Sequence, residues 1–126
     1  GTKHKYWELL NMDELIKPVI ELCEKQYGPG YIARATYVKL FAGRKVDRHI
    51  DVGGSYSLSH RIHVSLIAEE DKVIYNVRTE DKIFKLGEVW EINDLVEHEV
   101  RNESESDRIN LIMDYATMDG KGWWWK

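Results

Sequence analysis

The chain contains a single cysteine among its 126 residues. One thiol cannot form an internal disulfide, which excludes the small disulfide-stapled folds that are typical of secreted proteins. Cys23 falls on an apolar face of a predicted helix, where a free cysteine is most often a core residue rather than a nucleophile. The cysteine content therefore favours a protein of a reducing compartment.

The sequence also lacks a long hydrophobic run and an excess of positive charge. No run approaches the roughly 20 apolar residues that a membrane-spanning helix requires, and no signal peptide is recognisable. We therefore expect a cytoplasmic protein without a membrane partner. Eighteen basic and 22 acidic residues give a net charge of −4, so a nucleic acid partner is not expected either. The oligomeric state stays open.

The length suits one domain with one core and is too short for two full domains. Because no repeat or low-complexity tract occurs, we expect a single domain over 1–126. It would comprise an N-terminal helical segment (1–30), a β core (31–116) and a Trp-rich tail (117–126). Three adjacent indoles at 123–125 are rarely left in water. We expect them to pack on the protein, with a lid or a self-association surface as alternatives.

Residues 11–27 form the one convincing helical pattern. Asn11 can cap the helix, and Glu14 completes a capping box three residues later. Apolar residues then recur at helical spacing until the Tyr-Gly-Pro-Gly segment at 27–30 ends the helix. Pro18 lies inside the pattern and is expected to kink or split the helix.

From Tyr31 onward, short runs rich in Val, Ile, Tyr and Thr are separated by polar turns, which indicates an antiparallel sandwich or barrel. Residues 69–71 and 79–81 resemble hairpin turns. The alternation of apolar and polar residues over 61–66 predicts a half-buried strand. The predicted strands are 32–41, 46–50, 61–68, 72–78, 82–86, 88–92, 97–101 and 108–115.

Two histidines and an aspartate are candidate metal ligands. His49 and Asp51 are two residues apart, so on an extended strand their side chains project from the same face. The glycines at 53–54 leave room for a ligand, and a barrel can bring the strand of His98 beside the first. Two imidazoles and one carboxylate form the facial triad of non-haem Fe(II) oxygenases, although Mn, Co and Zn also bind such sets.

Two arginines and a third histidine lie within apolar strand patterns. Arg61 and His63 share one face of their strand. A cation facing a barrel interior is costly without an anionic partner, so these side chains either point to solvent or line a polar pocket, and we expect the pocket. Arg108 can grip a carboxylate with two parallel hydrogen bonds, or it can pair at the surface with Asp107 or Glu105.

With these residues assembled, the chain resembles the aspartyl/asparaginyl β-hydroxylase family of Fe(II)- and 2-oxoglutarate-dependent oxygenases. No single segment is specific, whereas the ordered set over residues 34–115 is. The segments that carry the resemblance are 40–43 (Leu-Phe-Ala-Gly), 49–51 (His-Ile-Asp), 61–64 (Arg-Ile-His-Val), 87–94, 98–102 and 108–114.

The resemblance implies a mainly β fold, namely a double-stranded β-helix (a jelly-roll, cupin-like barrel) with an N-terminal helix. It implies that His49, Asp51 and His98 bind Fe(II) and are the catalytic residues. Because the chain keeps Asp51, it resembles the three-ligand branch of the family and not the related halogenases. It lacks the helical-repeat region of animal members, which puts a large folded protein substrate in doubt.

The resemblance also assigns the cosubstrate. Arg108 looks like the residue that pairs with the distal carboxylate of 2-oxoglutarate, and Arg61 and His63 match the family's Arg-x-His, which helps to hold that cosubstrate. Dioxygen is the second cosubstrate. The implied activity is hydroxylation of an unactivated C–H bond, coupled to decarboxylation of 2-oxoglutarate to succinate and CO2.

The substrate implied by the resemblance is a small molecule or a peptide, with an Asp, Asn or Pro-like side chain that is free or in a peptide. The candidate substrate contacts near the mouth of the barrel are Tyr56, Ser57, His60 and Trp90. For His60, an exposed loop position is the alternative.

Two other functions fit parts of the pattern. A cupin-type metalloenzyme that does not use 2-oxoglutarate would keep the metal ligands and have no use for Arg108. A non-catalytic ligand-binding barrel would use the two histidines as polar core residues, since a fold shared with enzymes does not establish catalysis.

Overall fold

A computed structural model of the chain describes residues 12–51, 59–93 and 95–118. One helix precedes eight strands in the described residues. They are α2 (Met12–Tyr27), β1 (Gly30–Leu40), β2 (Lys45–His49), β3 (His60–Ile67), β4 (Val73–Val77), β5 (Glu80–Lys82), β6 (Val89–Glu91), β7 (His98–Asn102) and β8 (Arg108–Thr117). Within these ranges, no helix has the length and apolar character needed to cross a membrane.

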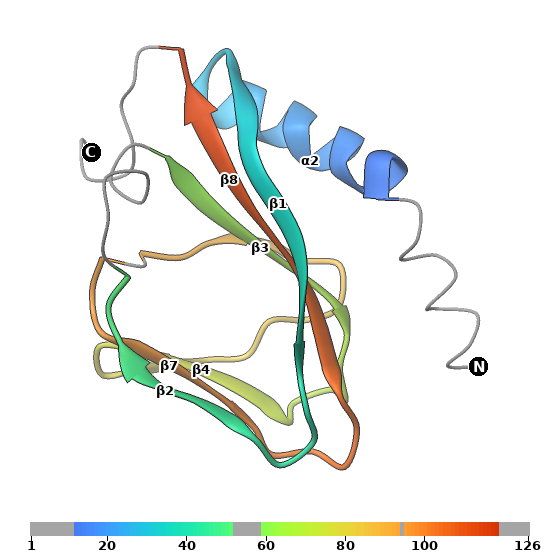
Figure 1. Cartoon of the computed structure of the whole chain (residues 1–126), viewed down its shortest axis with the longest axis vertical. Helices are drawn as coiled ribbons and strands as arrows, with labels where there is room; N and C mark the ends of the chain where they lie inside the picture. The colour runs from blue at the N-terminus through green and yellow to red at the C-terminus, as the bar shows by residue number, and fades with distance from the viewer. Residues whose placement is uncertain (1–11, 52–58, 94, 119–126) are drawn as a thin grey trace.

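The strands form two four-stranded antiparallel sheets that face each other (Figure 1). The order is β1-β8-β3-β6 in the first sheet and β2-β7-β4-β5 in the second. Successive strands repeatedly cross from one sheet to the other, so neighbours in a sheet, apart from the β4–β5 hairpin, are distant in the sequence. This arrangement is a jelly-roll barrel, and it confirms the predicted mainly β fold with an N-terminal helix.

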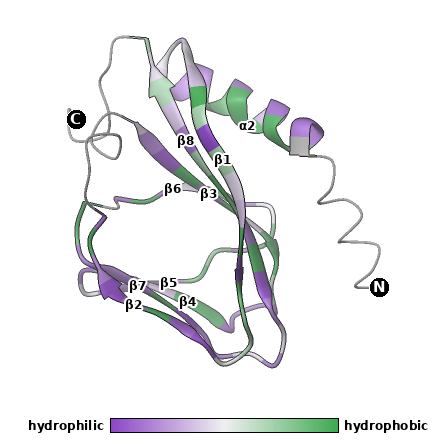
Figure 2. Cartoon of the chain, in the orientation of Figure 1, coloured by the Kyte–Doolittle hydropathy of each residue, from purple (hydrophilic) through white to green (hydrophobic). Residues whose placement is uncertain are grey.

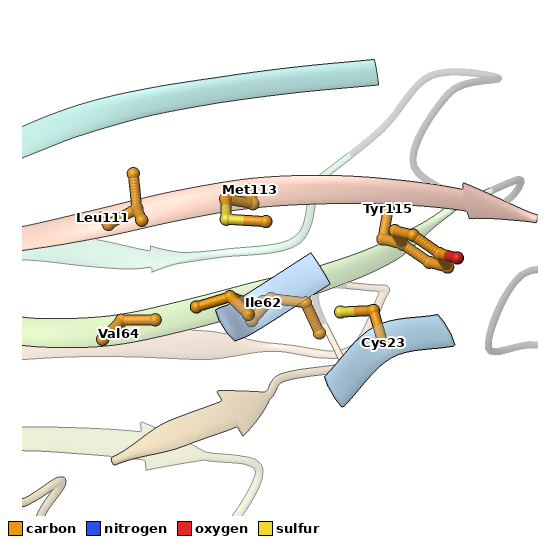
Figure 3. Close-up of a cluster of buried hydrophobic side chains, with 7 residues drawn as sticks. Cys23, Ile62, Val64, Leu111, Met113 and Tyr115 are labelled. Carbon is orange, nitrogen blue, oxygen red and sulfur yellow. The ribbon is translucent and has the colours of Figure 1, made fainter. Parts of the chain in front are cut away.

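Helix α2 covers the outer face of the first sheet. Val19 and Cys23 on the helix are buried against Ile62, Met113 and Tyr115 on β3 and β8 (Figure 3). Fully burying a side chain of the size of Ile or Met stabilises a fold by about 1.5–3 kcal/mol. Cys23 is therefore a core residue, as predicted, and burial raises the pKa of its thiol to about 11.

The ends of α2 follow from local chemistry. The helix is continuous over its 16 residues, so the expectation that Pro18 splits it is wrong, and the proline ring lies on the exposed face. Gly28 ends the helix with a φ of 95° while its amide donates to the carbonyl of Glu24, a conformation that favours glycine. The predicted cap, Asn11, lies outside the described residues.

Strand β3 is buried on both faces, so the predicted half-buried strand is wrong. Its outer residues, including Ile62, lie under α2, and its inner residues, including Arg61 and His63, face the second sheet. Figure 2 colours the N-terminal end of β3 as hydrophilic although the strand is buried. The inner face of this sheet is therefore a place where buried polar groups require partners.

A second core fills part of the space between the sheets. It consists of Leu40, Val73, Tyr75, Phe84, Ile92 and Val100. The ring of Phe84 stacks on Tyr75 with 4.2 Å between centroids, and on Trp90 with 4.8 Å. This aromatic row fills one side of the interior, and the cavity beside it is lined by both apolar and polar side chains.

The strand boundaries were predicted well except around β5. The turn at 69–71 is confirmed, whereas the expected turn at 79–81 and strand at 82–86 are displaced. The chain turns at Arg78 and Thr79, and Val77 pairs with Glu80. Arg78 has a φ of 56°, a conformation that hairpin turns usually assign to Gly or Asn, so the sequence carried no signal for this turn.

Candidate active site

The three predicted metal ligands come together between the ends of β2 and β7. A register shift after Val46 places His49 directly opposite His98, with 4.4 Å between the ring centroids. Asp51 follows β2 and directs Oδ1 to within 3.2 Å of Nε2 of His49, and Oδ2 to within 3.8 Å of Nε2 of His98. One ligand atom from each residue lies within 4.8 Å of the others, so the three can surround one ion.

Backbone carbonyls fix both imidazoles in the orientation that metal binding requires. Nδ1 of His49 lies 2.7 Å from the carbonyl oxygen of Asp47, and Nδ1 of His98 lies 2.8 Å from that of Val96. A carbonyl can only accept, so each Nδ1 carries the proton and each Nε2 keeps a free lone pair. Metal-binding histidines are typically oriented in this way. Two such nitrogens and a carboxylate fit a divalent ion such as Fe(II).

A cavity of about 170 Å³ lies between the two sheets next to these ligands. It is smaller than the roughly 300 Å³ at which pockets for drug-sized ligands begin, so it suits a small molecule. All six predicted metal and cosubstrate residues line it. The lining consists of Val38, Val46, His49, Asp51, Arg61, His63, Tyr75, Val77, Ile92, His98, Val100, Arg108 and Ile112.

Arg108 is a buried cation in this cavity, with 3% of its surface exposed. Its Nη1 donates to the hydroxyl of Tyr75, which also accepts from Nδ2 of Asn110. Nε of Arg108 has no partner, and among the described residues no carboxylate lies within ion-pair distance of the guanidinium. The surface pairing with Asp107 or Glu105 is therefore wrong, and the pocket position is confirmed.

His63 is a neutral, buried histidine beside Arg108. Burial lowers its pKa to about 3, and the cations of Arg108 and Arg61 act in the same direction. Its Nδ1 has no hydrogen-bond partner, as is also the case for Nε of Arg108 and Oδ1 of Asn110. Buried polar atoms without partners are rare and costly. Two of these residues, His63 and Arg108, line the cavity, which fits a small ligand that offers hydrogen-bond partners to both.

Arg61 also lines the cavity but is engaged with carboxylates. Nε and Nη2 donate to the two oxygens of Asp114 at 2.9 Å each. Nη1 lies 3.6 Å from Oδ2 of Asp51. The predicted pocket position is confirmed, and the guanidinium contacts one of the candidate metal ligands.

The predicted substrate contacts have different positions. Tyr56 and Ser57 lie outside the described residues. His60 is buried, so the exposed loop position is wrong, and it lies on the outer face of β3, where it stacks on Tyr27 with 3.7 Å between centroids. Its Nδ1 is 2.5 Å from Oε2 of Glu91. The structure does not bring His60 to the cavity, because neighbouring residues of a strand face opposite sides.

Trp90 lies on the inner side of the first sheet, paired with His63. It does not line the small cavity. It lines a neighbouring groove of about 510 Å³, and the residues Val77 and Ile92 line both spaces. Trp90 is therefore next to the cavity, separated from it by apolar side chains.

Tyr75, Asn110 and Asp114 belong to the site but were not predicted. Asn110 and Asp114 share a face with Arg108 through the two-residue period of β8, which is a usable signal. Tyr75 lies in an apolar strand and gave no such signal, because an aromatic residue in such a strand is normally part of the hydrophobic core.

The model of the aspartyl/asparaginyl beta-hydroxylase family matches residues 12–117. The chain belongs to this family. The matched range contains His49, Asp51, His98 and all three residues assigned to the cosubstrate. No curated protein sequence matches the chain significantly.

Solved structures share the fold of this family member at low sequence identity. The non-heme monooxygenase ThoJ, in its nickel complex, aligns with a TM-score of 0.58 and 19% identity over 79% of this chain, which spans only 49% of ThoJ. A predicted oxalate decarboxylase from Thermotoga maritima aligns with a TM-score of 0.52 and 18% identity over 75% of this chain and 73% of that one. A cupin domain from Bordetella pertussis Tohama I aligns with a TM-score of 0.50 and 11% identity over 70% of this chain and 92% of that one. These similarities establish the cupin-like barrel.

The chain therefore combines membership of the β-hydroxylase family with a candidate site for a divalent metal ion. The geometry suits metal binding because backbone carbonyls orient both imidazoles and the cavity beside the ligands is small.

Proposed function

We propose that the chain is an Fe(II)- and 2-oxoglutarate-dependent dioxygenase. It would hydroxylate an unactivated C–H bond of an amino-acid side chain of the Asp, Asn or Pro type, free or in a peptide. His49, Asp51 and His98 would hold the iron. Arg108 would bind the distal carboxylate of 2-oxoglutarate, with His63 and Arg61 beside it.

The observation that carries the proposal is the buried guanidinium of Arg108. It lines the same small cavity as the three metal ligands, and no carboxylate of the described residues pairs with it. A buried cation is stable only with an anionic partner. A dicarboxylate that reaches from the metal to Arg108 would supply that partner and a bidentate contact.

The other polar groups fit the same ligand. His63, which lines the cavity, is held neutral by burial and by neighbouring cations, and its Nδ1 has no hydrogen-bond partner. A neutral imidazole adds a hydrogen bond without adding a charge. The hydroxyl of Tyr75 accepts from Arg108 and Asn110, which holds the guanidinium in place before a ligand arrives.

When bound, iron would supply the oxidation, in which one atom of O2 enters the substrate C–H bond and the other enters succinate as 2-oxoglutarate loses CO2. The residues of the chain would bind and orient the reactants and exclude water. The groove lined by Trp90 is the approach that we assign to the substrate, because it neighbours the cavity, with Val77 and Ile92 lining both spaces.

Turnover of 2-oxoglutarate tests the proposal. Protein reconstituted with Fe(II) in air is expected to release succinate in an iron-dependent manner. His98→Ala should abolish release because it removes a ligand, and Arg108→Ala should raise the 2-oxoglutarate concentration required at least tenfold, since charged hydrogen bonds of about 1.5–3 kcal/mol are lost. Arg44→Ala is the control, because Arg44 is exposed. Succinate release by the His98 variant at the wild-type rate would contradict the proposal.

A further inference from the structure

A row of alternating charges crosses the first sheet and ends at the candidate metal site. Arg34 on β1 and Arg61 on β3 are both cross-strand partners of Asp114 on β8. Arg61 and Asp114 are 8% and 6% exposed, whereas Arg34 lies 3.7 Å from Asp114 with its side chain 56% exposed. The row continues from Arg61 to Asp51, which follows β2 of the other sheet.

The guanidinium of Arg61 contacts two carboxylates, each through different nitrogen atoms. Nε and Nη2 form a bidentate contact with Asp114, with both distances at 2.9 Å. This fork fixes the plane of the guanidinium, and its third nitrogen, Nη1, is then directed to Oδ2 of Asp51 at 3.6 Å. Asp114 therefore determines where Arg61 meets Asp51.

Asp51 needs such a neighbour because it lies beyond the end of β2, outside the sheet ladder that places His49 and His98. Carbonyl contacts orient the two imidazoles. For the carboxylate, the guanidinium of Arg61 approaches Oδ2 at 3.6 Å, and Nε2 of His98 lies 3.8 Å from the same oxygen.

We propose that Asp114 and Arg61 are positioning residues that hold the carboxylate of Asp51 in the orientation for metal binding. The inference rests on the metal site of the proposed function and is independent of 2-oxoglutarate. Removing a residue that contacts a metal ligand typically weakens metal binding 10–100-fold. The alternative is that Arg61 and Asp114 form a buried ion pair that contributes only to the stability of the fold. Removing one partner of such a pair is strongly destabilising.

A double-mutant cycle on metal affinity separates the two roles. Metal-free protein is titrated anaerobically with Fe(II), without 2-oxoglutarate, for the wild type, Asp114→Asn, Asp51→Ala and the double variant. We expect Asp114→Asn to weaken binding 10–100-fold in the wild-type background and to have no further effect when Asp51 is already Ala. Arg34→Gln is the matched control, because it removes only the half-exposed end of the row and should leave affinity within about twofold.

Equal losses in both backgrounds, or an unchanged affinity of Asp114→Asn, would overturn the inference. If Asp114→Asn does not fold, Arg61→Lys enters the same cycle, because an ammonium keeps the charge but cannot hold one carboxylate with a fork and reach a second. Adding 2-oxoglutarate afterwards separates the two proposals. Tight, Asp114-dependent iron binding without 2-oxoglutarate binding would leave the inference standing and contradict the cosubstrate assignment.

Discussion

Tyr75 is a single residue on which two buried donors depend. Its hydroxyl accepts from Nη1 of Arg108 and from Nδ2 of Asn110, and its ring lies 5.8 Å from the guanidinium carbon. Because the hydroxyl is between these groups and the aromatic core, one side chain connects the polar cavity with the hydrophobic interior. A buried donor that loses its acceptor incurs the full cost of its desolvation.

We expect Tyr75→Phe to lower the free energy of unfolding by about 1–3 kcal/mol. The substitution leaves the donors of Arg108 and Asn110 without their acceptor and changes the packed volume little. Urea denaturation of the metal-free protein measures this. Tyr31→Phe is the control, since Tyr31 is 55% exposed. An unchanged stability of Tyr75→Phe would mean that the hydroxyl does not bridge these residues.

His63 gives the stability a defined pH dependence. Its pKa is lowered from 6.5 to about 3 by burial and by the adjacent cations, so the unfolded chain binds a proton before the folded protein does. The corresponding stability is complete above pH 6.5 and is lost as the pH falls toward 3.

We therefore expect the free energy of unfolding of His63→Gln to decrease less steeply than that of the wild type as the pH falls from 6 to about 4. Each unit of pKa shift corresponds to about 1.4 kcal/mol. Urea denaturation of metal-free protein across this range gives the two slopes. Identical slopes would show that His63 titrates in the folded protein as it does in the unfolded chain.

At the scale of elements, the site depends on how closely β1 and β8 approach each other. Gly30 pairs with Thr117 at the start of β1. A Cβ at this position would lie 2.2 Å from the carbonyl oxygen of Ala116 and 2.8 Å from the ring of Tyr115. A backbone oxygen cannot move aside as a flexible side chain can, so the strand pair itself would have to shift.

Gly30→Ala is expected to destabilise the fold by about 1–3 kcal/mol, as overpacking does elsewhere, and to loosen the β1–β8 pairing first. Amide hydrogen exchange measures this locally. The amides of β4 and β7 in the other sheet are the internal control. Unchanged exchange along β1 would contradict the close approach.

The strand pattern also shows what a sequence can predict at this scale. Two-residue alternation identified which side chains share a face, so Arg61 and His63 were placed together correctly. It did not show that β3 is covered on both sides, because α2 reaches the outer face through contacts distant in the sequence. The turn at Arg78 and Thr79 was missed because no Gly or Asn occupies the positive-φ position.

At the scale of the whole molecule, the barrel brings together residues that are far apart in the chain. The ligand set was predictable because two imidazoles and a carboxylate have a recognisable chemistry, and because His49 and Asp51 are only two residues apart. The contacts of Arg61 with Asp114 and of Arg108 with Tyr75 were not predictable, since they depend on the strand orders β1-β8-β3-β6 and β2-β7-β4-β5. Periodicity does not encode those orders.

The two cores explain why the site lies where it does. One core lies between α2 and the first sheet, and the second fills one side of the space between the sheets. The remaining space between the sheets is the cavity that the metal ligands and Arg108 share. A single small volume thus has a metal-binding end and a cationic wall, which is the arrangement that a chelating dicarboxylate requires.

In the proposed enzyme, iron and 2-oxoglutarate bind together in this cavity. The most direct test is anaerobic addition of Fe(II) and 2-oxoglutarate to metal-free protein while the visible metal-to-ligand charge-transfer absorption is recorded. We predict that the band forms with the wild type and with Arg44→Ala, weakens with Arg108→Ala, and is absent with His98→Ala. Iron binding without the band would contradict the cosubstrate assignment and favour a cupin-type metalloenzyme, and no iron binding would contradict the metal site itself.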